Sequence, residues 1–74
     1  MTTETEIAIT VNGETRDVPA GLTLDDVLRH AGIDPSQSGI AVAQNGGIVR
    51  RAAWTETEVG AGDELEVITA TQGG

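Results

Sequence analysis

One segment of the sequence, residues 24–31, has the spacing of an amphipathic helix. Its apolar side chains recur at positions i, i+3, i+4 and i+7, and they are Leu24, Val27, Leu28 and Ala31. Thr23 is suited to be the N-cap, with an acid three residues later, and Gly32 is suited to end the helix in a left-handed conformation. A helix with one apolar side must bury that side. The rest of this 74-residue chain is therefore expected to supply one opposing surface.

Short strands on both sides of the helix are predicted to form that surface. Apolar residues alternate in the first segment, and Asn12-Gly13 predicts a tight turn into a second strand. Asn45-Gly46-Gly47 predicts a similar turn between two later strands, whose faces the pattern leaves ambiguous. The five predicted strands are residues 6–11, 14–18, 40–44, 48–50 and 64–69. Residues 51–54 suggest a short turn of helix, with Trp54 as a packing residue.

This order of elements predicts an α+β fold, in which a mixed sheet of four to five strands packs on one main helix. That is the β-grasp arrangement. If the first and last strands are central neighbours, four side chains become buried against the helix: Ile7, Ile9, Leu65 and Val67. We therefore expect one β-grasp domain over residues 1–70 and a flexible diglycine tail over residues 71–74.

Composition excludes several classes of function. The chain has no cysteine, which rules out a disulfide framework, a thiolate nucleophile and a cysteine-ligated metal. Its formal net charge of −8, with four arginines and no lysine, opposes binding to nucleic acid. The acidic surface suits either a basic protein partner or solubility alone. The first residues lack the features of a signal peptide, and no apolar run approaches the roughly 20 residues that span a bilayer, so we expect a cytoplasmic protein with no membrane contact.

The most informative feature for function is Gly73-Gly74 after the last predicted strand. Glycine lacks a Cβ, so Thr71, Gln72 and Gly73 are expected to thread into a narrow channel of a partner and present the carboxyl group of Gly74. A carboxylate is a poor electrophile, and activation by ATP would give an acyl-adenylate that can then receive sulfur as a thiocarboxylate. The chain has no GxxxxGK[ST] phosphate loop, so a separate enzyme must use the ATP and Mg²⁺. The alternative interpretation is a chain end without function.

The sequence resembles the ThiS-type sulfur carriers of thiamine biosynthesis, which belong to the ubiquitin-like β-grasp proteins of the MoaD/ThiS superfamily. The likeness covers nearly the whole chain, and the order of its fragments is quite specific. The matching fragments are Val11-Asn12-Gly13, Thr23-Leu24, residues 41–46, Ile48-Val49, Arg51, Trp54, residues 62–68 and Gly73-Gly74.

The resemblance implies a protein co-substrate rather than an enzyme, with no catalytic residue, metal or bound cofactor of its own. It implies adenylation of Gly74 by a ThiF-type adenylyltransferase, sulfur from a cysteine desulfurase or another donor relay, and delivery to thiazole synthase. Arg50 stands where many members have proline, and Thr71-Gln72 differs from the usual apolar approach to the glycines. Alternatives are a sulfur carrier for molybdopterin or another pathway, a ubiquitin-like protein modifier, and an interaction module with an inert tail.

Several other residues are candidates for contact with a partner. Ile68 and Ala70 are expected to face away from the core, and Ala8 could join them if the end strands are adjacent. Arg50 and Arg51 could pair with an acidic loop of a partner, although solvated arginines are the simpler interpretation. His30 and the Asp25-Asp26 pair lie at opposite ends of the predicted helix, where their charges suit the helix dipole. We assign no catalysis to them.

Overall fold

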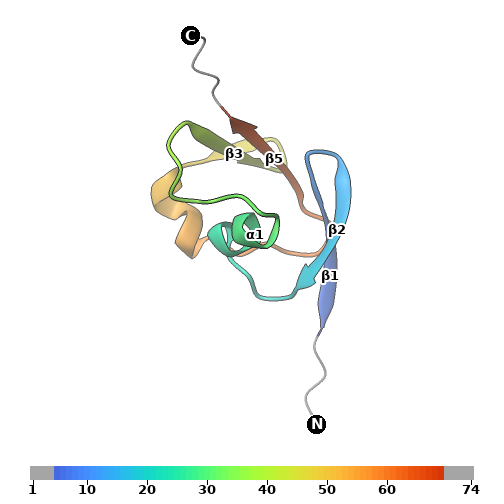
Figure 1. Cartoon of the computed structure of the whole chain (residues 1–74). Helices are drawn as coiled ribbons and strands as arrows, with labels where there is room; N and C mark the ends of the chain where they lie inside the picture. The colour runs from blue at the N-terminus through green and yellow to red at the C-terminus, as the bar shows by residue number, and fades with distance from the viewer. Residues whose placement is uncertain (1–4, 70–74) are drawn as a thin grey trace.

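The computed structural model describes residues 5–69, which form one mixed sheet wrapped around one α-helix (Figure 1). The elements are β1 (Glu6–Val11), β2 (Glu14–Pro19), α1 (Leu24–His30), β3 (Ile40–Gln44), β4 (Gly47–Val49), the 3₁₀ helix η1 (Arg51–Glu56) and β5 (Glu64–Thr69). The strand order is β2-β1-β5-β3-β4. The first and last strands, β1 and β5, are parallel central neighbours, and the other pairs are antiparallel. The predicted α+β class and the five-stranded mixed sheet are confirmed.

Both predicted hairpin turns rest on an asparagine followed by a glycine in the left-handed region. The φ angles are 54° at Asn12 and 84° at Gly13, and 52° at Asn45 and 88° at Gly46. Glycine and asparagine reach this region at the lowest cost, which is why the dipeptides were strong signals. The second turn is shorter than predicted, because Gly47 already belongs to β4, where it pairs with Gln44 of β3.

The helix begins and ends where its capping residues indicate. The backbone N–H of Thr23 donates to Asp26 Oδ2 at 3.4 Å, which forms one half of a capping box. The helix ends at His30 with Ala31 as the C-cap, and Gly32 follows with a φ of 83°. The local sequence therefore sets both ends of α1.

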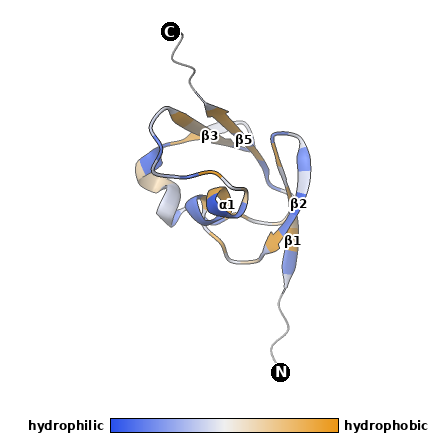
Figure 2. Cartoon of the chain, in the orientation of Figure 1, coloured by the Kyte–Doolittle hydropathy of each residue, from blue (hydrophilic) through white to orange (hydrophobic). Residues whose placement is uncertain are grey.

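The apolar stripe of α1 forms the centre of the core. Leu24, Val27 and Leu28 are at most 1% exposed, and the inward side chains of the sheet cover them. Figure 2 shows hydrophobic colouring in β3, in β5 and on part of α1, while β2 and the rest of the helix are largely hydrophilic. The buried residues from the sheet are Ile9, Val11, Val18, Val42 and Leu65. Each such side chain contributes about 1.5–3 kcal/mol when fully buried.

The first and last strands meet at the centre of the sheet. Thr10 N–H donates to Asp63 C=O at 3.0 Å, and Asn12 N–H donates to Leu65 C=O at 2.9 Å. This parallel pairing buries Ile9 and Leu65, while Ile7 and Val67 pack at the edge of the core and stay partly exposed. The expectation that the first and last strands are neighbours in the sheet is thus confirmed.

The segment between β4 and β5 closes the open side of the core. Trp54 in η1 is buried, and its Nε1–H donates to Val49 C=O at 2.9 Å, as suits a packing residue. Val59 is also buried, and its N–H donates to Leu22 C=O at 3.0 Å. The sequence pattern did not predict Val59 as a core residue, because it lies in a loop with no apolar period.

We expect Leu28→Ala to lower the free energy of unfolding by about 2–5 kcal/mol, because it removes a fully buried side chain from the helix stripe. Urea denaturation monitored by circular dichroism measures this change. The control is Ile48→Ala, which alters a side chain that is 66% exposed and should change stability by less than about 0.5 kcal/mol. Equal losses in the two variants would contradict this assignment of the core.

Candidate functional site

The predicted modification site and its approach lie outside the described residues 5–69. This applies to Gly74, to the threading residues Thr71, Gln72 and Gly73, and to the predicted contact Ala70. Their roles stay predictions. The structure does describe the strand that precedes them, β5, which lies between β1 and β3 in the middle of the sheet.

Side chains from both hairpin turns fix the position of β5. Asn12 Oδ1 accepts from the N–H of Val67 at 2.8 Å, and Asn45 Oδ1 accepts from the N–H of Glu64 at 2.9 Å. Each asparagine therefore serves twice, because it adopts the left-handed turn conformation and satisfies a backbone donor of β5. β5 is therefore hydrogen-bonded to one hairpin turn on each side.

Asp63, the residue before β5, accepts three hydrogen bonds through its carboxylate. Its Oδ2 accepts from Gln44 Nε2 at 2.9 Å and from Gly60 N–H at 2.8 Å, while its Oδ1 accepts from Asn45 Nδ2 at 3.1 Å. Burial raises the pKa of Asp63, but these three hydrogen bonds favour the ionised form more strongly. The net effect lowers the pKa below its ordinary value of 3.8. The carboxylate thus joins the β3–β4 turn to β5.

The sheet has an outer face, opposite α1, on which the two exposed large apolar residues lie. Ile68 in β5 is 51% exposed and Ile48 in β4 is 66% exposed. The register aligns Ala41 with Ile68 and Ala43 with Ile48, so two small β3 residues separate the isoleucines. We call these four residues the apolar strip. The strip contains the predicted contact Ile68 and lies close to the end of β5.

The suggestion that Ala8 joins Ile68 in one patch is wrong, although the two residues share the outer face. The end strands are adjacent, as the suggestion required, but their register separates the two side chains. The C=O of Ala8 accepts from Gly62 N–H at 2.8 Å, six residues before Ile68 along the chain. At about 3.3 Å per residue the two sites are roughly 20 Å apart.

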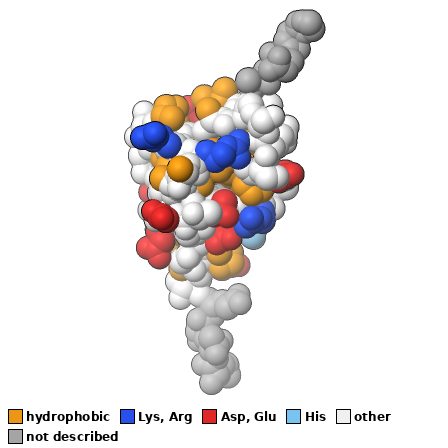
Figure 3. Space-filling model, turned by 90° about the vertical axis from the view of Figure 1, so that its left-hand side faces the viewer, with side chains coloured by type: hydrophobic (Ala, Val, Ile, Leu, Met, Phe, Trp, Pro, Cys, Tyr) orange, Lys and Arg blue, Asp and Glu red, His pale blue; other side chains and the backbone are white. Residues whose placement is uncertain are grey.

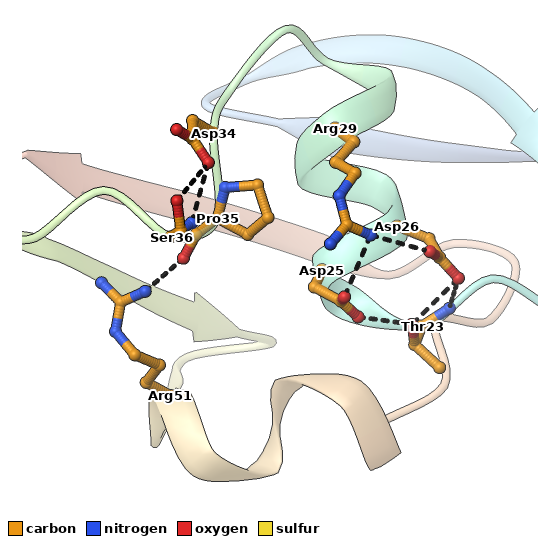
Figure 4. A network of polar contacts seen from close by, with 8 residues as sticks. All are labelled: Thr23, Asp25, Asp26, Arg29, Asp34, Pro35, Ser36 and Arg51. Carbon is orange, nitrogen blue, oxygen red and sulfur yellow. Dashed lines mark hydrogen bonds and ion pairs between the residues drawn. The ribbon is translucent and has the colours of Figure 1, made fainter.

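The two predicted arginine contacts occupy different environments. Arg51 donates to the carbonyl of Pro35 (Figure 4). It also donates to the carbonyl of Gln37 at 2.6 Å, and its guanidinium lies 4.6 Å from the centre of the Trp54 ring. It therefore ties a loop to η1. Arg50 is exposed and has extended backbone after Val49, so its side chain continues the alternation of β4 onto the side of Ile48. The register brings Arg50 and Ile68 to the same end of the apolar strip.

A groove of ≈310 Å³ lies between α1 and η1, and the charged groups that line it form ion pairs or hydrogen bonds within the chain. Arg29 pairs with Asp25 at 3.2 Å and with Asp26 at 3.4 Å (Figure 4). Hydrogen bonds from the N–H and hydroxyl of Ser36 hold the pKa of Asp34 below its ordinary value. Figure 3 shows basic, acidic and hydrophobic side chains intermixed on the η1 side of the molecule. The Asp25-Asp26 pair thus stabilises the N-terminal end of α1, as the sequence indicated.

Within residues 5–69 no group of His, Asp and Glu side chains is arranged to hold a metal ion. No helix in that range is long and apolar enough to span a membrane. The C=O of His30, at the end of α1, accepts from Arg16 Nη1 at 3.5 Å.

Comparisons with known proteins agree with this architecture. The family model described as "ThiS family" matches residues 9–74. The thiamine biosynthesis protein ThiS from Geobacter metallireducens has a similar structure, with a TM-score of 0.73 and 29% sequence identity, over 92% of this chain and 100% of that one. A thiazole synthase from Paramagnetospirillum magneticum is 32% identical over 66 residues, which are 89% of this chain. The chain spans only 20% of the length of that relative.

The sheet order β2-β1-β5-β3-β4, with one helix packed on a single face, defines a ubiquitin-like β-grasp domain. Within that class, the family match covers almost the whole sequence and continues through Gly74. The chain belongs to the ThiS family.

We expect Asp63→Asn to weaken the fold at neutral pH by about 1–3 kcal/mol, because an amide cannot accept all three hydrogen bonds. The lowered pKa of Asp63 also makes stability depend on pH. The stabilisation is fully present above the unfolded-state value near 3.8 and is lost as the pH falls through the lower folded-state pKa. Urea unfolding at a series of pH values should therefore show that, at acid pH, the free energy of unfolding falls less steeply with decreasing pH in the variant than in the wild-type protein. Parallel curves for the two proteins would contradict this role.

Proposed function

We propose that this protein is a sulfur carrier for formation of the thiamine thiazole ring, with the carboxyl group of Gly74 as the carrying site. The observation that carries the proposal is the ThiS family match, which includes Gly73 and Gly74. The similarity to a solved thiamine biosynthesis protein over the full length of that protein supports the same pathway.

The chemistry needs two steps at the same carbonyl carbon. In the first step an oxygen of the Gly74 carboxylate attacks the α-phosphorus of ATP, and pyrophosphate leaves. In the second step a sulfur nucleophile attacks the carbonyl carbon of the acyl-adenylate, and AMP leaves. When the nucleophile is sulfide, the product is a thiocarboxylate. When the nucleophile is a persulfide, the product is an acyl disulfide, and a thiol must then cleave its S–S bond to release the thiocarboxylate and form a new disulfide. The sulfur of the thiocarboxylate is anionic and nucleophilic, for the reason that thiolates are.

A partner enzyme must supply the catalytic groups for these steps. The chain has no phosphate-binding loop of the GxxxxGK[ST] type, and residues 5–69 hold no metal-binding cluster. We propose a ThiF-type adenylyltransferase that binds ATP and Mg²⁺ and stabilises the developing charge on the phosphates. The sulfur would come from a cysteine desulfurase or another donor relay. In this scheme the chain acts as a co-substrate.

Thiazole synthase is the proposed acceptor of the sulfur. The similarity of this chain to one fifth of a protein named thiazole synthase supports this choice, because it links a domain of this kind with that enzyme in one polypeptide. A carrier for molybdopterin or another pathway would use the same terminal chemistry. A protein modifier would instead transfer the Gly74 acyl group to an amine. The product formed at Gly74 therefore distinguishes a carrier from a modifier, and the acceptor distinguishes the pathways.

The test is intact-mass spectrometry after incubation with a ThiF-type enzyme, MgATP and a sulfur donor. We expect one oxygen of the chain to be replaced by sulfur, and we expect removal of Gly74 to abolish this change because the reacting carboxyl group is displaced. Adding thiazole synthase and its small-molecule substrates should consume the loaded form.

Two controls make the result specific. A variant that lacks residues 2–4, which precede the family match, should be loaded like the full chain. Circular dichroism should show that removal of Gly74 leaves the fold unchanged. Normal loading of the chain without Gly74, or adducts with amines in place of sulfur, would refute the proposal.

A further inference from the structure

We propose that Asn12 is a positioning residue for the reaction at Gly74, because its side-chain amide adds a hydrogen bond to β5 beyond the point where the pairing of β1 with β5 ends. This inference rests on the proposed function, since it concerns the chain end that a partner enzyme would activate. The role acts through Val67 in the second half of β5 and needs no contact between Asn12 and the reacting carboxyl group.

The pairing of β1 with β5 follows the pattern of a parallel ladder. Thr10 N–H donates to Asp63 C=O, and Asn12 N–H donates to Leu65 C=O. In such a ladder, a residue that donates to the neighbouring strand also accepts, at its own C=O, from a residue two positions further along that strand. The next donor in the series is therefore the N–H of Val67, and its regular acceptor would be the backbone C=O of Asn12.

The side chain of Asn12 takes the place of this backbone acceptor. The regular pairing stops at Val11 and Leu65, because Asn12 enters the turn toward β2 with a φ of 54°. Asn12 Oδ1 then accepts from the N–H of Val67 at 2.8 Å. An amide oxygen has the same acceptor chemistry as a backbone carbonyl oxygen. The ladder is thus extended by one hydrogen bond past the end of β1.

This hydrogen bond lies where β5 has less support from the core. Leu65 is 1% exposed, Val67 is half-buried, and Ile68 is 51% exposed. β3 continues to pair with β5 as far as Thr69. On the side of β1, in the part of the chain that the structure describes, the contact from Asn12 is the hydrogen bond that β5 keeps past its regular pairing. It therefore limits rotation of this part of β5 about its pairing with β3.

The position of the end of β5 bears on the chemistry because residues 70–74 connect Thr69 to the terminus. A channel narrow enough to require glycine would hold such a segment extended, at about 3.3–3.6 Å per residue. An extended segment has little slack, so a shift of Thr69 is passed on to the carboxyl group of Gly74. Misplacement of a reacting group by about 1 Å can lower a rate by as much as ~100-fold. Asn12 should therefore affect the rate at Gly74 more than the affinity for the enzyme.

The second Asn-Gly turn provides a comparison within the same chain. Asn45 has a φ of 52°, and its Oδ1 accepts from the N–H of Glu64, the first residue of β5, at 2.9 Å. The two asparagines thus make the same kind of contact with opposite halves of one strand. Replacing either asparagine with glycine keeps the left-handed turn and removes the acceptor. The two substitutions therefore separate general weakening of β5 from a change near the tail.

The experiment compares Asn12→Gly and Asn12→Asp in the full chain. Hydrogen exchange followed by NMR should show that Asn12→Gly lowers the protection of the Val67 amide by about fivefold. With the ThiF-type enzyme, Asn12→Gly should lower the kcat of the chain in ATP–pyrophosphate exchange by about fivefold and change its KM by less than about twofold. Asn12→Asp keeps the acceptor, so it should restore the protection of Val67 and return kcat to within about twofold of the wild-type value.

The matched control is Asn45→Gly, which makes the same substitution in the same type of turn and removes hydrogen bonds at the start of β5. Urea denaturation should show that it lowers stability at least as much as Asn12→Gly, because Asn45 makes one more side-chain hydrogen bond, to Asp63. The same measurement verifies that both variants are folded under the assay conditions. The control should leave kcat within about twofold of the wild-type value.

Several results would overturn the positioning role while leaving loading of the wild-type chain intact. They are unchanged exchange of the Val67 amide in Asn12→Gly, an unchanged kcat in that variant, and equal losses of kcat in the two glycine variants. Failure of Asn12→Asp to recover kcat would also overturn it. Absence of loading in the wild-type chain is a different failure, because it would refute the sulfur-carrier function and the positioning role together.

Discussion

The parallel pairing of β1 with β5 is the contact on which the rest of this structure depends. It brings residues from the two ends of the chain together at the centre of the sheet, with Asn12 N–H bonded to Leu65 C=O. Contacts between residues so far apart in sequence are costly in chain entropy, so they need support from burial. The stripe of α1 supplies that support by covering Ile9 and Leu65. Without this pairing the sheet would divide into the β1–β2 hairpin and a three-stranded sheet of β5, β3 and β4.

Local sequence signals predicted the elements well because each signal has a local physical cause. The Asn-Gly turns follow from backbone sterics, and the ends of α1 follow from Thr23 and Gly32. The faces of β3 stayed ambiguous because Ala41, Val42 and Ala43 are all apolar. The structure resolves this ambiguity. Val42 points into the core, while Ala43 is covered on the outer face, between its neighbours Ile48 and Glu66 in the register.

What the sequence could not predict depends on the register between distant strands. Asp63, Gln44 and Asn45 are ordinary polar residues of turns and strand ends until the fold brings them together. Val59 has no periodic neighbours to mark it as buried. Ile68 was placed correctly on the side away from the core by strand alternation alone, but Ala8 was misplaced because adjacency does not specify register. For the predicted site, the diglycine after the last strand and the family likeness both indicated Gly74, which lies outside residues 5–69.

The arrangement of charge separates the groups that brace the fold from the outer face of β5. Arg29 and Arg51 are engaged within the chain, in contacts that brace α1, η1 and the loop between α1 and β3. The outward residues of β5 make no such internal ion pairs within residues 5–69. A strand has a side-chain period of two, so Leu65 can be fixed by the core while Glu64 and Glu66 remain available. Changes on the outer face are therefore expected to cost little stability, because the core side chains that hold β5 in place point the other way.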